Sequence, residues 1–139
     1  MTRPSRRGAT AVEVALTMPL FVALLAGVFD LAWLAFQRSA LTSSAALGCR
    51  VGALQDPGED DAAWDEMEDA VDLAIRDALA ATGTPCTADT CVVEVTAFGE
   101  DPGRSLGCTV RRDYASLTGL LPAPDEIEYT LVVRMEWQR

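Results

Sequence analysis

The longest apolar run of the chain begins near residue 9 and continues to residue 37. From Val14 to Phe29 it carries no charge, and beyond Asp30 its apolar character continues to Phe36. A helix of about 23 residues, rising about 1.5 Å per residue, spans about 34 Å and can cross the hydrocarbon core of a bilayer. We therefore predict a transmembrane helix over residues 9–37.

Two acidic residues and one proline interrupt this run. Glu13 lies near its start, and an isolated acidic side chain at a helix centre costs about 2.5–3.5 kcal/mol unless it has a partner or a function. Asp30 lies close to Trp33, and we expect it at the outer interface, where an acidic group costs less. Pro19 removes one backbone donor, so a kink or local loosening is expected there. Glu13 is therefore the first candidate for a functional side chain.

Helical spacing of apolar and small residues continues beyond Arg38, which predicts one helix from about residue 10 to 54. Its small side chains would let another element approach closely. Residues 56–58, Asp-Pro-Gly, break the helix. A second, amphipathic helix is predicted from about residue 62 to 81 and is closed by Gly83 and Pro85. Its apolar stripe consists of Trp64, Met67, Val71, Ala74, Ile75 and Ala78.

Three runs of alternating polarity follow, and their β-branched residues predict strands. Residues 100–103 are predicted to form the turn of the first hairpin, and residues 122–125 to separate the second strand from the third. We predict an α+β fold in which a three-stranded antiparallel meander packs against the helices. The residues that share one face of each strand are Val93, Val95 and Ala97; Cys108, Val110, Arg112 and Tyr114; and Ile127, Tyr129, Leu131, Val133, Met135 and Trp137.

Charge is distributed unevenly along the chain. It has 11 basic and 21 acidic residues, a formal net charge of -10. Arg3, Arg6 and Arg7 precede the apolar run, whereas nearly all the acids follow it, so the positive-inside rule predicts that residues 38–139 are exported. An acidic domain without a basic patch argues against a nucleic-acid partner.

The sequence offers little support for catalysis. It contains no histidine, which removes the commonest general base and the commonest metal ligand. Serine hydroxyls therefore have no histidine to activate them. The remaining candidates, Glu94, Asp113 and Glu128, fall on strand faces where exposed charge is ordinary. We expect no enzymatic activity, no cofactor and no metal.

Four cysteines, Cys49, Cys86, Cys91 and Cys108, lie on the exported side, where two disulfides are the default. One close pair and two single cysteines do not resemble the paired knuckles of a zinc site. In the predicted hairpin Cys91 and Cys108 would lie about 15 Å apart along the ladder, beyond disulfide reach. We therefore expect Cys86 to pair with Cys91 and Cys49 with Cys108.

The N-terminal sequence carries the most specific motif. Arg6-Arg7-Gly8 is followed by Ala-Thr-Ala-Val-Glu-Val-Ala-Leu over residues 9–16 and by Met-Pro-Leu over residues 18–20. This order resembles the amino terminus of TadE-like proteins, the minor pseudopilins of Tad (Flp) pilus systems within the type IV pilin class. Later segments also resemble the family, although the first 53 residues are the most specific; the later segments are 30–41, 45–53, 117–122 and 133–136.

The resemblance implies that a prepilin peptidase cuts between Gly8 and Ala9 on the cytoplasmic face. Residues 1–8 would then be a basic leader peptide, and Glu13 would become the fifth residue of the mature chain. The amine freed at Ala9 and the Glu13 carboxylate are four residues apart, so they can pair on one helix face or between subunits. Val14 stands where pilin-like proteins often carry an aromatic residue.

We therefore expect a non-catalytic minor pseudopilin that acts in pilus assembly or as a minor filament component. Its partners would be the membrane, the prepilin peptidase, other pilins and the Tad assembly machinery. It would cross the bacterial cytoplasmic membrane once, with its N-terminus inside. The alternative is an uncleaved single-pass membrane protein whose disulfide-bonded exported domain binds another envelope protein, and N-terminal sequencing distinguishes the two.

Overall fold

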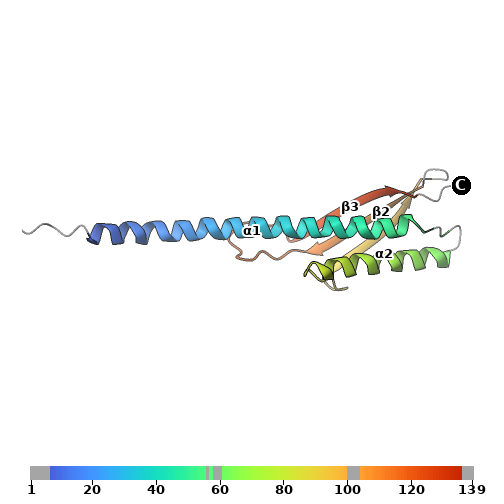
Figure 1. Ribbon diagram of the computed structural model, residues 1–139, viewed down its shortest axis with the longest axis horizontal. Helices are drawn as coiled ribbons and strands as arrows, with labels where there is room; N and C mark the ends of the chain where they lie inside the picture. Colours follow the sequence, from blue (N-terminus) through green and yellow to red (C-terminus); the bar gives the residue numbers. More distant parts are fainter. Residues whose placement is uncertain (1–6, 56, 58–60, 100–103, 136–139) are drawn as a thin grey trace, which may run out of the picture. The chain divides into compact units, whose positions relative to one another are not determined.

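The structure is a computed structural model that describes residues 7–55, 57, 61–99 and 104–135, with side chains from residue 11 onwards. Its elements are the helices α1 (Arg7–Ala53) and α2 (Asp61–Ala81) and the strands β1 (Cys91–Phe98), β2 (Ser105–Asp113) and β3 (Glu126–Arg134) (Figure 1). A long apolar helix, a second helix and a three-stranded antiparallel sheet confirm the predicted α+β fold.

Helix α1 is a single helix of 47 residues that begins three residues earlier than predicted. It continues without interruption through Pro19, although proline has no amide hydrogen to donate. At its other end the amide of Gln55 donates to the carbonyl of Gly52 at 3.0 Å, which satisfies one of the last carbonyls of the helix. Of the predicted break at residues 56–58, only Pro57 belongs to the described residues.

The chain divides into two compact units, and α1 passes through both. The first unit contains residues 1–34 and 115–123, and the second contains residues 35–114 and 124–139. Residues 115–123, which connect β2 to β3, therefore belong with the first part of α1 and not with the sheet.

The sheet of the second unit is an antiparallel meander in the order β1-β2-β3, as predicted. Val95, Cys108 and Leu131 lie opposite one another across the three strands. Burial alternates along β3, where Ile127 is buried and its neighbours are exposed. Met135 is buried just after the strand ends, whereas Trp137 and the hairpin turn at residues 100–103 lie outside the described residues.

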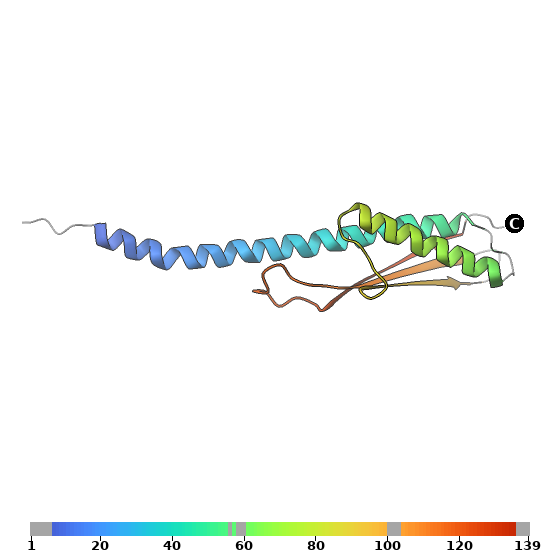
Figure 2. The same ribbon diagram turned by 90° about the horizontal axis from the view of Figure 1, so that it is seen from below.

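The core of the second unit forms where α2 and the last turns of α1 cover one face of the sheet (Figures 1 and 2). Each helix contributes a row of buried residues spaced four apart, which is one face of a helix. In α1, Leu41 and Ala45 belong to the helical pattern predicted after Arg38, whereas Cys49 and Ala53 were not part of it. In α2 the row includes Leu79, which the predicted stripe omitted; that stripe contained Trp64, Ala74 and Ala78, which are only half-buried. The rows are Leu41, Ala45, Cys49 and Ala53 in α1, and Met67, Val71, Ile75 and Leu79 in α2.

Two glycines let α1 approach its neighbours closely, as its small residues predicted. A Cβ atom on Gly52 would lie 2.6 Å from Cδ2 of Leu106 in β2 and 2.7 Å from Cγ2 of Val71 in α2. A Cβ atom on Gly48 would lie 3.1 Å from the carbonyl oxygen of Val71 and would overlap Ile75. The interior is therefore filled at both positions, and a larger side chain would displace its neighbours.

Two disulfides complete the second unit. The Cys49–Cys108 bridge links α1 to β2 across a sequence separation of 59, and the Cys86–Cys91 bridge closes a loop at the start of β1 with a separation of 5. This is the pairing expected from the sequence, and the sheet register supplies its reason. Cys91 lies opposite Arg112 and not opposite Cys108, so those two cysteines are four positions apart along the ladder.

Candidate functional site

The predicted processing positions lie at the first turn of α1. Gly8 and Ala9 are the second and third residues of the helix, and their backbone is helical. The rest of the predicted leader, residues 1–6, lies outside the described residues. The first turn of α1 contains no acidic residue that would stabilise its N-terminus, so it gains nothing from the helix dipole.

Glu13 lies one helical turn after Ala9 and is exposed. Within the part of the chain that the structure describes, its carboxylate has no hydrogen bond or ion pair. The hydroxyl of Thr17, four residues on, donates to the backbone carbonyl of Glu13 at 2.9 Å and so does not reach for the side chain. The carboxylate is therefore available to a group from outside the described chain.

The surface around Glu13 is apolar and exposed. Val12 is 60% exposed, Val14 51% and Leu16 74%, and large apolar side chains continue in the same way as far as Leu31. By length and composition α1 can cross a membrane. Contact of an apolar surface of this extent with water is unfavourable, so the surface requires a lipid or protein environment. Glu13 is thus a charged group on a surface that avoids water.

The structure adds a contact that the sequence did not predict, between Asp30 and the 115–123 loop. Asp30 is only 4% exposed. Its Oδ1 accepts a hydrogen bond from the backbone N–H of Thr118 (N···O 2.8 Å), and its Oδ2 accepts one from the Thr118 hydroxyl (O···O 2.5 Å). One turn earlier, a Cβ atom on Gly27 would lie 3.6 Å from Leu121, so the loop also packs on the helix there. Asp30 therefore fastens the loop to α1.

The expectation that Asp30 lies near the outer interface stays a prediction, but the low cost of an acid there is not the whole reason why the carboxylate is tolerated. The carboxylate is buried by the protein itself, and hydrogen bonds to Thr118 offset its desolvation. Asp30 and Thr118 are 88 residues apart, so no local pattern links them. The only signal in the sequence was an acid inside an apolar run and a distant uncharged Leu-Thr-Gly-Leu segment at residues 117–120.

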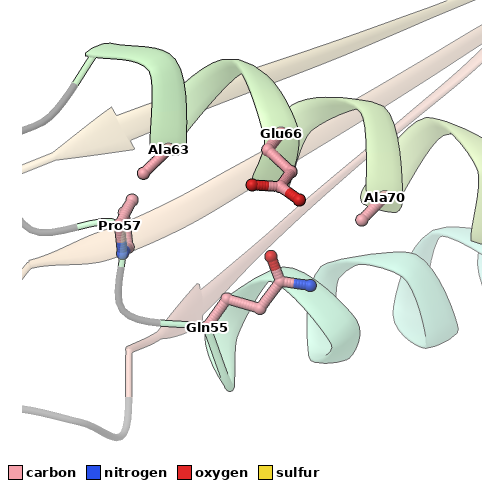
Figure 3. A pocket seen from close by; sticks show the side chains of 5 residues that line it. All are labelled: Gln55, Pro57, Ala63, Glu66 and Ala70. Carbon is pink, nitrogen blue, oxygen red and sulfur yellow. The ribbon is translucent and has the colours of Figure 1, made fainter.

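The second unit has shallow hollows. One of 340 Å³ lies where α1 ends and α2 begins, and Figure 3 shows the Glu66 carboxylate and the Gln55 amide turned toward each other across it, with Pro57, Ala63 and Ala70 around them. A wider groove of 700 Å³ runs between α1 and β3 and has Arg50 and Arg134 on otherwise apolar walls. Among the described residues, no cluster of three acidic, cysteine or histidine side chains is placed to bind a metal.

Fold and site together define a small α+β protein with a lipid-compatible N-terminal helix and a disulfide-bonded C-terminal unit. Residues 8–50 match the family model described as TadE-like protein, which confirms the resemblance seen in the sequence. The match contains Gly8, Ala9, Glu13 and Asp30. No curated protein and no solved structure matches the chain.

Proposed function

We propose that the protein is a minor pseudopilin of a Tad pilus. Helix α1 holds it in the bacterial cytoplasmic membrane, with the basic N-terminus inside and the disulfide-bonded unit outside. The observation that carries this proposal is that the family match at residues 8–50 contains Glu13, an exposed carboxylate on an apolar helix that has no partner among the described residues. A carboxylate on such a surface needs a partner, and pseudopilin maturation supplies one.

In this proposal a prepilin peptidase cuts between Gly8 and Ala9. Because both residues are helical in the structure, the first turn of α1 has to open before an extended backbone can enter the protease. Opening is inexpensive, since terminal turns fray and glycine disfavours a helix by about 1 kcal/mol relative to alanine. Glycine also leaves no side chain to block the cleft.

Cleavage would create an ammonium group at Ala9, about 6 Å along the helix axis from Glu13 at about 1.5 Å per residue. The two charges can pair within one subunit, or Glu13 can receive the amine of a neighbouring subunit. Either pairing offsets the cost of holding both charges in an apolar environment. Pairing between subunits would also set their register, because only one stagger of two apolar helices brings the groups together.

The processing step is tested by the intact mass of the protein purified from its native membrane. The wild-type mass should lack residues 1–8 and four thiol hydrogens. Gly8→Arg should leave a full-length precursor, because a large charged side chain then occupies the position before the cut. Ser5→Arg is the matched control: it adds the same charge to the leader but leaves the cleavage position unchanged, and it should mature normally.

Normal maturation of Gly8→Arg would contradict cleavage after Gly8. A wild-type protein that functions with residues 1–8 still attached would favour the alternative, an uncleaved single-pass protein whose exported unit binds another envelope protein. Failure of Ser5→Arg to mature would show that the leader charge, and not Gly8, controls processing.

A further inference from the structure

We propose that the 115–123 loop is a second membrane contact, which lies in the outer lipid interface with its leucines among the lipid chains and is held there by Asp30. This inference rests on the proposed membrane anchoring of α1. It assigns a lipid-binding role to a loop that follows β2, far from the apolar helix in the sequence.

The composition of the loop fits this role. Its sequence is Ala-Ser-Leu-Thr-Gly-Leu-Leu-Pro-Ala, with no charge, in a chain of which 23% is charged. Leu117 is 59% exposed, Leu120 62% and Leu121 37%. Gly119 adopts a positive φ of 68°, a left-handed conformation that suits glycine, and so turns the chain between the first leucine and the other two. Three leucines exposed on nine uncharged residues form an apolar patch that water does not stabilise.

The position of the loop identifies lipid as the occupant of this patch. Within the first unit, Asp30 and Gly27 hold the loop against α1. The helix residues beside these contacts are exposed and apolar, with Val28 at 64%, Phe29 at 62% and Leu31 at 60%. The exposed leucines of the loop and this exposed apolar stretch of α1 therefore belong to one compact unit, and in the proposal the same lipid covers both.

Depth along the helix supports an interfacial location. If the hydrocarbon core begins near Glu13, a helix of about 20 residues crosses it and reaches its outer boundary near residue 33. Asp30 and Gly27 then lie about 5 to 9 Å below the outer boundary, at about 1.5 Å per residue. Interfacial amphipathic segments bury their apolar face to about 5–10 Å, so the loop leucines reach a depth at which they are stable.

Irregular backbone at this depth needs internal hydrogen-bond partners. The Asp30 carboxylate accepts the N–H of Thr118 at 2.8 Å. The Thr118 hydroxyl oxygen accepts a hydrogen bond from the N–H of Leu120 (N···O 3.3 Å), and the hydroxyl hydrogen is donated to Asp30. Two amides of the turn, those of Thr118 and Leu120, are thus satisfied by one buried carboxylate and one hydroxyl. This explains why an acid occupies an otherwise apolar run.

The test is site-specific photocrosslinking of the full-length protein in vesicles of phosphatidylethanolamine and phosphatidylglycerol. Benzoylphenylalanine replaces Leu120 in the loop, Leu24 in α1 or Leu73 in α2, which are 62%, 62% and 61% exposed. The three sites match in residue type and exposure. After irradiation, intact mass spectrometry measures lipid adducts and gel electrophoresis detects crosslinked dimers.

Lipid adducts at positions 24 and 120, several-fold above those at position 73, are the expected result. Adducts at 24 without adducts at 120 would overturn the loop contact and leave the membrane anchor intact. A crosslink from 120 to a second copy of the chain, in place of lipid, would overturn it in favour of a subunit contact. Absence of adducts at 24 would overturn the membrane anchoring and the loop contact together. Adducts at 73 equal to those at 120 would overturn the loop contact, because the loop would then meet lipid no more than α2 does.

Discussion

Replacing Asp30 by Ala removes both acceptors that hold the 115–123 loop on α1. The backbone N–H and the hydroxyl of Thr118 would each lose their partner. Alanine is a strong helix former, so the substitution does not weaken α1 itself. The expected consequence is that the loop opens more often while the helix and the sheet keep their structure.

The magnitude follows from the hydrogen bonds. A hydrogen bond to a charged acceptor contributes about 1.5–3 kcal/mol, because both groups are otherwise desolvated. Opening of the loop in the wild-type protein has to break at least the bond to the Thr118 amide. Loss of this hydrogen bond should therefore increase the population of the open loop by about 10-fold to about 100-fold, at about 1.4 kcal/mol per factor of ten.

Hydrogen–deuterium exchange of individual amides in lipid micelles measures this population directly. In Asp30→Ala the Thr118 amide should exchange about 10 to 100 times faster than in the wild-type protein. The Tyr114 amide is the internal control, since it donates to the carbonyl of Asp125 at 2.8 Å beside the loop and should keep its rate. Thr118→Val retains the backbone bond and loses the hydroxyl, so it should give an intermediate rate.

Unchanged exchange at Thr118 in Asp30→Ala would refute the view that Asp30 fastens the loop. Faster exchange at Tyr114 to the same extent would also refute it, because the carboxylate would then support the second unit as a whole. Only a change confined to the loop agrees with the geometry.

Other consequences of the structure can be measured as well. Replacing Cys49 and Cys108 by serine should lower the free energy of unfolding by about 4 kcal/mol, from the chain-entropy estimate for a separation of 59. The same estimate gives about 2 kcal/mol for the Cys86–Cys91 disulfide, with a separation of 5. A smaller shift in the urea midpoint on loss of the Cys49–Cys108 bridge than on loss of the Cys86–Cys91 bridge would contradict this order. Gly52→Ala should destabilise the protein by about 1–3 kcal/mol in thermal unfolding, because its Cβ atom meets filled space, whereas Gly27→Ala makes an ordinary contact and should not. Glu13→Gln should leave membrane insertion unchanged but lower piliation several-fold in electron micrographs, and normal piliation would argue against a role for its charge in assembly.

Much of the fold follows from local patterns. The apolar run predicted α1, and alternation along β2 and β3 predicted the sheet, because a period of two places every second residue on one face. The disulfide pairing followed from the strand register. In α2 the predicted stripe was only partly correct, since the buried row at spacing four includes Leu79 and not Trp64. Propensity alone does not decide which neighbouring stripe of an amphipathic helix faces the sheet.

The sequence by itself determined where the chain avoids water, which residues share a face and which cysteines can meet, because spacing along a helix or strand sets the direction of each side chain. Only the tertiary structure decided what covers each apolar surface. It brought Thr118 to Asp30 across 88 residues and showed that this carboxylate is a buried attachment point for a loop. The physical reason is that an apolar pattern specifies exclusion of water but not whether lipid or protein replaces it, and a hydrogen bond between distant residues leaves no periodic trace in the sequence.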